Sequence, residues 1–162
     1  MPPTMQTADR TGPAMFDTMP AAELQPIATL VCKQGVAIGL LPPQDRRRAL
    51  ALAWSVLPRG QVHSEAEVNH LLRNMLDGPG RFLRTDHVEL RRWLVDEGWL
   101  VRDGFGREYR APMPAMLPAA CQAVAATLEG VDVAAWVDAL LREKQAAAEQ
   151  RRAAWAARQS GG

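Results

Sequence analysis

Apolar residues recur at the spacing of one helix face in the middle of the chain, at positions i, i+3, i+4, i+7 and i+8. These residues are Val68, Leu71, Leu72, Met75 and Leu76. Ser64 and Glu67 precede them as a capping-box pair, in which the Ser64 hydroxyl accepts from the Glu67 amide and the Glu67 carboxylate reaches back to the Ser64 amide. The pattern predicts an amphipathic helix that begins after Ser64.

A second helix and a β-hairpin are predicted directly downstream. Thr85 or Asp86 caps the helix, Leu90, Trp93 and Leu94 form its apolar face, and Gly98 ends it. Residues 99–102 and 107–110 then flank the turn sequence Asp-Gly-Phe-Gly, which suits a hairpin. With a first small strand at residues 61–63, this is the element order of a winged helix-turn-helix.

The upstream half of the chain predicts two further helices. One covers Asp45–Leu57, with Leu50, Trp54 and Leu57 on one face and residues 58–60, Pro-Arg-Gly, stopping it. Before it, residues 19–41 form an N-terminal helix whose apolar positions are Leu24, Ile27, Leu30 and Val31. Pro26 suits a first turn and Gly35 an end of that helix. We expect residues 1–18 to be disordered, since they are rich in Met, Pro, Thr and Gly without periodicity.

Residues 113–162 predict a helical extension. After a Pro-rich linker, Ala119–Leu128 reads as a short helix stopped by Gly130, and Asp132 caps a long final helix. One stripe of that helix is apolar and either packs back on the core or pairs with a second copy; it consists of Val133, Trp136, Val137, Leu140 and Leu141. The fold class is therefore mainly α with a small β-hairpin: a winged helix-turn-helix-like core over residues 42–112, an N-terminal helix and a long C-terminal helix.

Composition narrows the function classes only weakly. The net charge of +1 gives no overall attraction to nucleic acid, so nucleic-acid binding would depend on local patches of positive charge. Cys32 and Cys121 lack metal or redox spacing and are interpreted as reduced core residues, with a disulfide as the minority interpretation. The histidines His63, His70 and His87 form no metal motif, and no phosphate- or dinucleotide-binding glycine pattern occurs. We expect a non-enzymatic protein without metal or cofactor.

The chain has no signal-peptide pattern and no apolar run near the roughly 20 residues that span a bilayer. We therefore expect a cytoplasmic location without membrane contact.

Three short motifs resemble one bacterial family. They are Glu67-Val68-Asn69, the pattern LRRxLVDxGxLxR over residues 90–102, and Gly106 with Tyr109 and Arg110. The family is a domain of unknown function with a winged-helix-like fold, found alone or fused behind arsenical-repressor-type helix-turn-helix domains. The resemblance covers about residues 40–111. It implies a winged-helix fold and an association with transcriptional regulation, and no established ligand or catalytic residue.

The charges bear on DNA binding in two opposite ways. Residues 85–97 hold Asp86, Glu89, Asp96 and Glu97 against Arg91 and Arg92, a net of −2, which is unfavourable for a helix that reads DNA. With Leu90 and Leu94 facing inward, Thr85, Glu89, Arg92 and Asp96 face outward. Candidate phosphate contacts lie at the periphery, and Arg92 is the leading candidate base reader; the full candidate set is Arg46, Arg47, Arg48, Arg84, Arg92, Arg107 and Arg110.

Structural roles compete with this interpretation. The arginines can be solvated or paired with Glu65, Glu67, Asp96 and Glu97, and internal pairing is favoured for Arg91 and Arg92. Asn69, unfavourable inside a helix, is better explained by a link to the third helix or the wing than by nucleic-acid contact. Tyr109 is better explained as a core-edge residue with a solvated hydroxyl than as a ligand platform.

Two functions follow. The first is a DNA-binding or transcription-associated winged-helix protein. The second is a protein-interaction module, whose winged helix and C-terminal helix dock a partner or a second copy.

Overall fold

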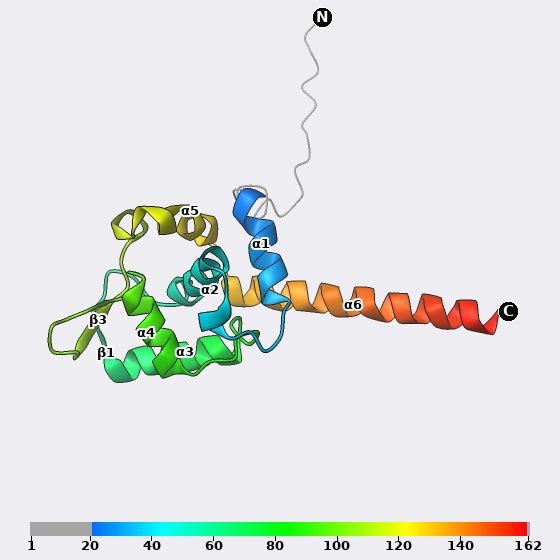
Figure 1. Ribbon diagram of the computed structural model, residues 1–162, viewed down its shortest axis with the longest axis horizontal. Helices are drawn as coiled ribbons and strands as arrows, with labels where there is room; N and C mark the ends of the chain where they lie inside the picture. The colour runs from blue at the N-terminus through cyan, green and yellow to red at the C-terminus, as the bar shows by residue number, and fades with distance from the viewer. Residues whose placement is uncertain (1–20, 162) are drawn as a thin grey trace, which may run out of the picture.

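The computed structural model describes residues 21–161 (Figure 1). The protein is mainly helical, with a small three-stranded antiparallel sheet and a long C-terminal helix, which confirms the prediction of a mainly α fold with a small β-hairpin. The expectation of disorder over residues 1–18 falls outside the described residues. In chain order the elements are α1 (Ala21–Val31), the 3-10 helix η1 (Ile38–Leu40), α2 (Pro43–Ser55), β1 (His63–Ser64), α3 (Glu65–Asp77), α4 (His87–Asp96), β2 (Val101–Arg102), β3 (Glu108–Arg110), the 3-10 helix η2 (Pro114–Met116), α5 (Ala119–Leu128) and α6 (Val133–Ser160).

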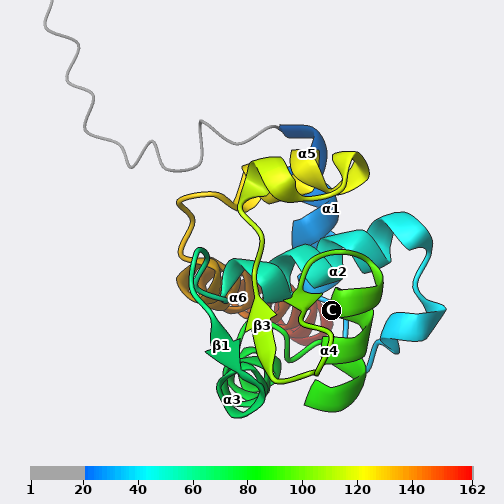
Figure 2. The same cartoon turned by 90° about the vertical axis from the view of Figure 1, so that its left-hand side faces the viewer.

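Helix α2 is at the centre of the core. α1 and α5 pack on one side of it and α4 on another, while α3 packs against α4 (Figures 1 and 2). Leu50, Trp54 and Leu57 are buried as predicted, but Leu52 and the neighbouring alanines are buried as well. A helix with neighbours all round must be apolar all round, and the run ALALAW over residues 49–54 meets this demand.

The ends of α3 and α4 follow the local sequence. The Ser64 side chain accepts a hydrogen bond from the Glu67 amide at 3.2 Å, and Asp86 accepts from the Glu89 amide at 2.8 Å. The predicted return contact from Glu67 to the Ser64 amide is replaced by another, since the Glu67 carboxylate lies 3.3 Å from His63 Nδ1. Gly98, with a φ of +84°, takes the chain from α4 toward β2 in a conformation that favours glycine.

The three strands form a sheet in the order β1-β3-β2. His63 and Arg102 both pair with Tyr109, so these three residues share one face of the sheet. Ser64 pairs with Glu108, and Val101 pairs with Arg110 on the opposite face. This register decides which arginines of the hairpin face α4.

Helix α1 differs from the prediction in two respects. Pro26 lies inside α1 and not in its first turn, which removes a backbone hydrogen bond; burial of Ile27, Leu30 and Val31 offsets this loss. The helix ends at Val31, before Gly35 and well before residue 41. The chain beyond α1 forms backbone hydrogen bonds with a distant segment instead: the Val36 amide donates to the Phe82 carbonyl at 2.9 Å, and the Val36 carbonyl accepts from the Arg84 amide at 2.7 Å.

Helix α6 combines a docked beginning with a projecting end. Asp132 caps it, as predicted, by accepting from the Ala135 amide at 3.1 Å. Val133, Trp136 and Val137 are buried, and Leu140 and Leu141 pack against the same core, so the apolar stripe packs back on the body of the protein. Lys144 still donates to the Cys32 carbonyl at 2.6 Å, and beyond Ala148 the helix projects from the body of the protein (Figure 1). None of the described helices is both long enough and apolar enough to cross a membrane.

Candidate nucleic-acid interface

Helix α4 presents three different faces to its surroundings. Leu90 and Leu94 are fully buried toward the core, whereas Glu89, Arg92 and Asp96 are exposed, as the apolar spacing predicted. The side toward α2 is held by Arg46, whose guanidinium lies 4.6 Å from the centre of the Trp93 ring and 2.6 Å from the Glu97 carboxylate. The side of α4 that carries Glu89, Arg92 and Asp96 therefore remains exposed and can contact other molecules.

Arg91 links α4 to α3. Its Nη1 donates to the Asn69 side-chain oxygen, its Nη2 lies 3.2 Å from the Glu65 carboxylate, and its guanidinium lies 5.7 Å from the centre of the Tyr109 ring. The internal pairing of Arg91 and the structural role of Asn69 are thus confirmed. Arg92 behaves differently: it makes no ion pair with any residue in 21–161.

The arginine run at the start of α2 is engaged within the fold. Arg46 pairs with Glu97, and Arg48 pairs with Glu23 at 2.9 Å and with Asp45 at 2.8 Å. Its hydrogen bond to Glu23, followed by that to Asp45, raises the pKa of the Arg48 guanidinium despite its partial burial. Arg47 is half-buried beside α5. The structure therefore places this run against α1, α4 and α5, apart from the exposed edge of α4.

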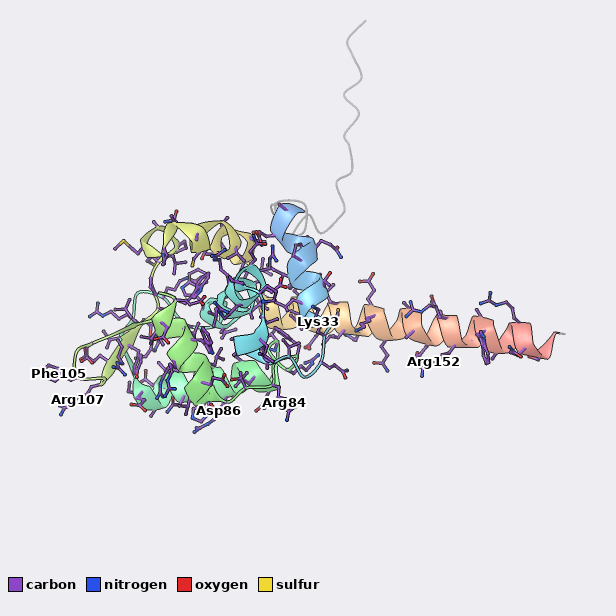
Figure 3. All side chains as sticks on the ribbon, in the orientation of Figure 1. Lys33, Arg84, Asp86, Phe105, Arg107 and Arg152 are labelled. Atoms are coloured by element: carbon purple, nitrogen blue, oxygen red, sulfur yellow. The ribbon has the colours of Figure 1, made fainter. Side chains whose placement is uncertain are left out.

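The hairpin presents its arginines in different directions. Arg102 shares the α4-facing side of the sheet with Tyr109, whereas Arg110 lies on the opposite side. Arg107 and the exposed Phe105 project from the tip of the hairpin (Figure 3). The loop between the strands is held by Asp103, whose hydrogen bond from the Arg107 amide at 2.8 Å is the main cause of its lowered pKa.

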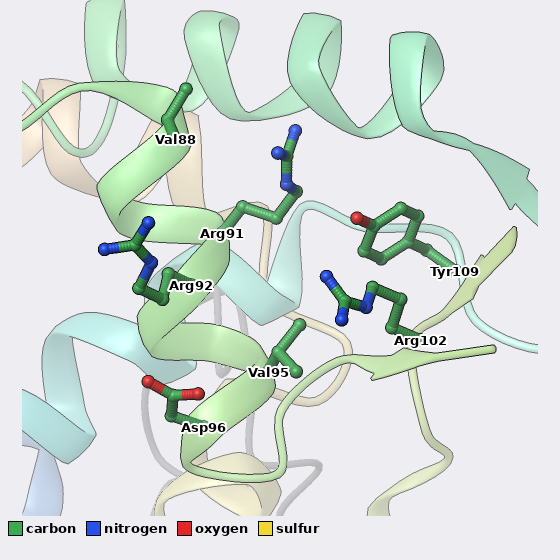
Figure 4. Close-up of a pocket in the computed structure, with 7 residues that line it drawn as sticks. All are labelled: Val88, Arg91, Arg92, Val95, Asp96, Arg102 and Tyr109. Carbon is green, nitrogen blue, oxygen red and sulfur yellow. The ribbon is translucent and has the colours of Figure 1, made fainter. Parts of the chain in front are cut away.

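A cleft of about 330 Å³ lies between α4 and the hairpin (Figure 4). The carboxylate of Asp96 and the side chains of Val88 and Val95 line it together with three arginines and a tyrosine, namely Arg91, Arg92, Arg102 and Tyr109. Arg102 and the Tyr109 hydroxyl point into the gap between helix and sheet, and Arg92 lies at the rim on the other side of α4. The cleft is thus a cationic depression with one carboxylate at its border.

Three carboxylates near this surface make hydrogen bonds or an ion pair within the fold. Asp86 caps α4, Asp103 holds the hairpin loop, and Glu97 is paired with Arg46. These partners do not change the count of −2 over residues 85–97, because Arg46 balances Glu97 while Glu65 on α3 balances Arg91. Three exposed acids of this segment have no ion-pair partner among the described residues: Asp86, Glu89, which accepts from the Thr85 hydroxyl at 2.6 Å, and Asp96.

Residues 41–111 match the model of a bacterial family. The family is described as an uncharacterized protein conserved in bacteria, DUF2087. No curated protein and no solved structure matches the chain. The match spans α2 to β3 and agrees with the range of about 40–111 over which the motifs resemble a bacterial domain of unknown function.

Every residue that lines the cleft lies within the DUF2087 match, whereas α1, α5 and α6 lie outside it. Of the candidate arginines in the match, the structure brings Arg92 and Arg107 to the α4–hairpin end of the molecule. Arg84 lies with Asp86 at the N-terminal end of α4 (Figure 3), and its side chain makes no ion pair within the described residues. Arg102 is a further arginine of the hairpin, and the strand register places it beside Tyr109.

The remaining polar groups give no sign of a metal centre. Within residues 21–161, no group of three or more His, Cys, Asp or Glu side chains is placed to hold a metal ion. Cys32 and Cys121 are both free, as predicted; Cys121 is buried and Cys32 is half-buried.

Proposed function

We propose that this chain is a non-enzymatic, transcription-associated DNA-binding protein of the winged-helix type. The order α2, β1, α3, α4 and hairpin β2–β3 is that of a winged helix. By analogy with that architecture, α4 would enter the major groove and the hairpin would act as the wing against the DNA backbone. The assignment of α4 as the reading helix rests on this analogy.

One observation supports DNA binding most directly. Arg92, Arg102 and Arg107 are exposed, they belong to α4 or the hairpin, and they make no ion pair with a described residue. Other arginines in the DUF2087 match include Arg46 and Arg59, which have carboxylate partners, and Arg84, which has none and lies at the N-terminal end of α4. Phosphate neutralisation dominates DNA affinity, so unpaired arginines grouped at one end of the protein favour contact with a backbone there.

Fluorescence anisotropy with labelled mixed-sequence duplexes, at low and at moderate salt, tests this proposal. We expect binding that weakens as salt rises. Arg92→Ala and Arg107→Ala should each weaken binding about three- to tenfold, since hydrogen bonds to charged groups contribute roughly 1.5–3 kcal/mol and exposure reduces this. Arg152→Ala, on the distal part of α6 (Figure 3), is the matched control and should bind like the wild type. Absence of binding at low salt, or an equal loss in the control, would refute the proposal.

A second function, docking of a protein partner or a second copy, is favoured by the distal half of α6. This half projects from the body, and its Trp155 is 61% exposed. Tryptophan is enriched among the residues that dominate protein interfaces. We infer that the projecting part of α6 is the docking element, because the apolar stripe of residues 133–141 is already packed on the core.

The mass of the protein in solution, measured by light scattering, tests whether the projecting part of α6 docks a second copy. Removal of residues 149–162 keeps the buried stripe and the bond from Lys144 to the Cys32 carbonyl. A wild-type dimer that becomes a monomer on this truncation, and on Trp155→Ala, supports self-association. A monomer throughout excludes it.

A further inference from the structure

We propose that the cleft between α4 and the hairpin is a binding site for a single phosphate group, with the Arg102 guanidinium and the Tyr109 hydroxyl as its donors. Where that phosphate belongs to a DNA backbone, the inference rests on the proposed function; a phosphorylated small molecule offers the same chemistry.

The state of Tyr109 is the first observation that points to a ligand. Its ring is buried, and its hydroxyl, which makes no hydrogen bond with any described residue, opens into the cleft (Figure 4). A tyrosine whose ring is buried and whose hydroxyl faces a cleft offers that hydroxyl as a donor to a ligand there. The ring is fixed by its strand register opposite His63 and Arg102, so the hydroxyl is held at the wall of the cleft.

The charge of the cleft selects an anion. Three guanidinium groups and one carboxylate line it. Arg91 is held by Asn69 and Glu65, so its charge is balanced and it offers no free donor fork. Arg102 and Arg92 have no ion-pair partner within residues 21–161 and can donate to a ligand.

The shape and donor set favour phosphate over carboxylate. The volume of about 330 Å³ is about ten times the roughly 30 Å³ that one water occupies, so a phosphate group and its ester substituent can enter. Arg102 and Tyr109 approach from the sheet, and Arg92 lies at the rim on α4. A tetrahedral oxyanion offers oxygens in three directions to such donors, whereas a planar carboxylate offers two oxygens in one plane.

Two probes, inorganic phosphate followed by amide chemical shifts and a mixed-sequence DNA duplex followed by anisotropy, test the site. Arg102→Ala should weaken binding about tenfold, and with DNA it should lower the salt slope by about 0.9. Tyr109→Phe should weaken binding about three- to fivefold and leave the salt slope unchanged, since it removes a neutral donor. Asp96→Asn should strengthen binding several-fold, because it removes the lining carboxylate.

Arg110→Ala is the matched control, because Arg110 lies on the same small sheet but on the face opposite Arg102. It should leave phosphate binding unchanged, and a thermal melt of each variant checks that the fold is retained. Losses in Arg102→Ala and Tyr109→Phe that Arg110→Ala does not share support the site.

The outcomes separate this inference from the proposed function. Binding of phosphate without binding of DNA leaves the site standing, with a small phosphorylated molecule as its source, and refutes the DNA function. Binding of DNA by Tyr109→Phe and Arg102→Ala that is indistinguishable from that of the wild type overturns the site and leaves the DNA function standing. Absence of binding to both probes refutes both.

Discussion

The contact between Asn69 and Arg91 predicts a structural role that can be separated from nucleic-acid binding. Asn69→Ala removes the acceptor of a hydrogen bond from an arginine whose side chain is only 17% exposed. A hydrogen bond to a charged group contributes about 1.5–3 kcal/mol. Glu65 is half exposed and remains as a partner of Arg91, so we place the loss near the lower end, at about 2 kcal/mol.

A double-mutant cycle with Arg91→Met measures this link. For a chain of this size, about 2 kcal/mol corresponds to a fall in Tm of about 4–8 °C. The two changes together should cost about 1–2 kcal/mol less than the sum of the single changes, since each removes the same contact. Urea unfolding and thermal melts followed by circular dichroism give both quantities. Asn74→Ala is the matched control. Asn74 lies on the same helix and is exposed, and among the described residues its side chain hydrogen-bonds only to His70, at 3.3 Å, so we expect a change within about 0.5 kcal/mol.

One result would refute this reasoning. If Arg91→Met retains wild-type stability but weakens DNA binding as much as Arg92→Ala does, Arg91 is a nucleic-acid contact and the link to α3 is incidental. Losses of stability in Asn69→Ala and Asn74→Ala of equal size would show that the amide contact contributes nothing specific.

Three further predictions follow from buried and loop groups. Trp54 and Trp99 are both fully buried, but the Trp54 indole donates to a backbone carbonyl at 3.0 Å while the Trp99 indole has no partner among the described residues. Replacement by Phe should therefore lower the free energy of unfolding, measured in urea, by about 1–3 kcal/mol more at Trp54 than at Trp99. Equal losses at the two positions would contradict this. Burial raises the pKa of the Cys121 thiol, so iodoacetamide should label the half-buried Cys32 first, and Cys32→Ala should leave a protein that labels only slowly while folded. Hydrogen bonds from loop amides lower the pKa of Asp103 below its ordinary value of 3.8. The stabilisation that the Asp103 carboxylate gives the hairpin is therefore complete above pH 3.8 and is lost as the pH falls through the lowered pKa. Amide exchange in the loop should rise in this acidic range, and Asp103→Asn should remove the pH dependence.

Several features of the fold could be predicted from local sequence because their causes are local. Ser64 and Asp86 cap α3 and α4 through amides three residues away, and Gly98 ends α4 with a positive φ that other residues rarely adopt. The apolar spacing of α3 and α4 identified the buried faces. The sequence also predicted the α6 stripe, but it left open whether the stripe packs on the core or on a second copy.

The interface could be predicted only in part because charge pairing is not local. The sequence alone determined that arginines surround the third helix and the hairpin, and that Asn69 serves a link within the fold. Only the tertiary structure decided that Arg46 pairs with Glu97, which is 51 residues away, and that Arg91 pairs with Glu65 on α3. The strand register likewise placed Arg102 beside Tyr109 and turned Arg110 to the other face. Helical and strand periodicity arise from bonds between near neighbours, whereas the partner of a charged side chain depends on which distant segments packing brings together.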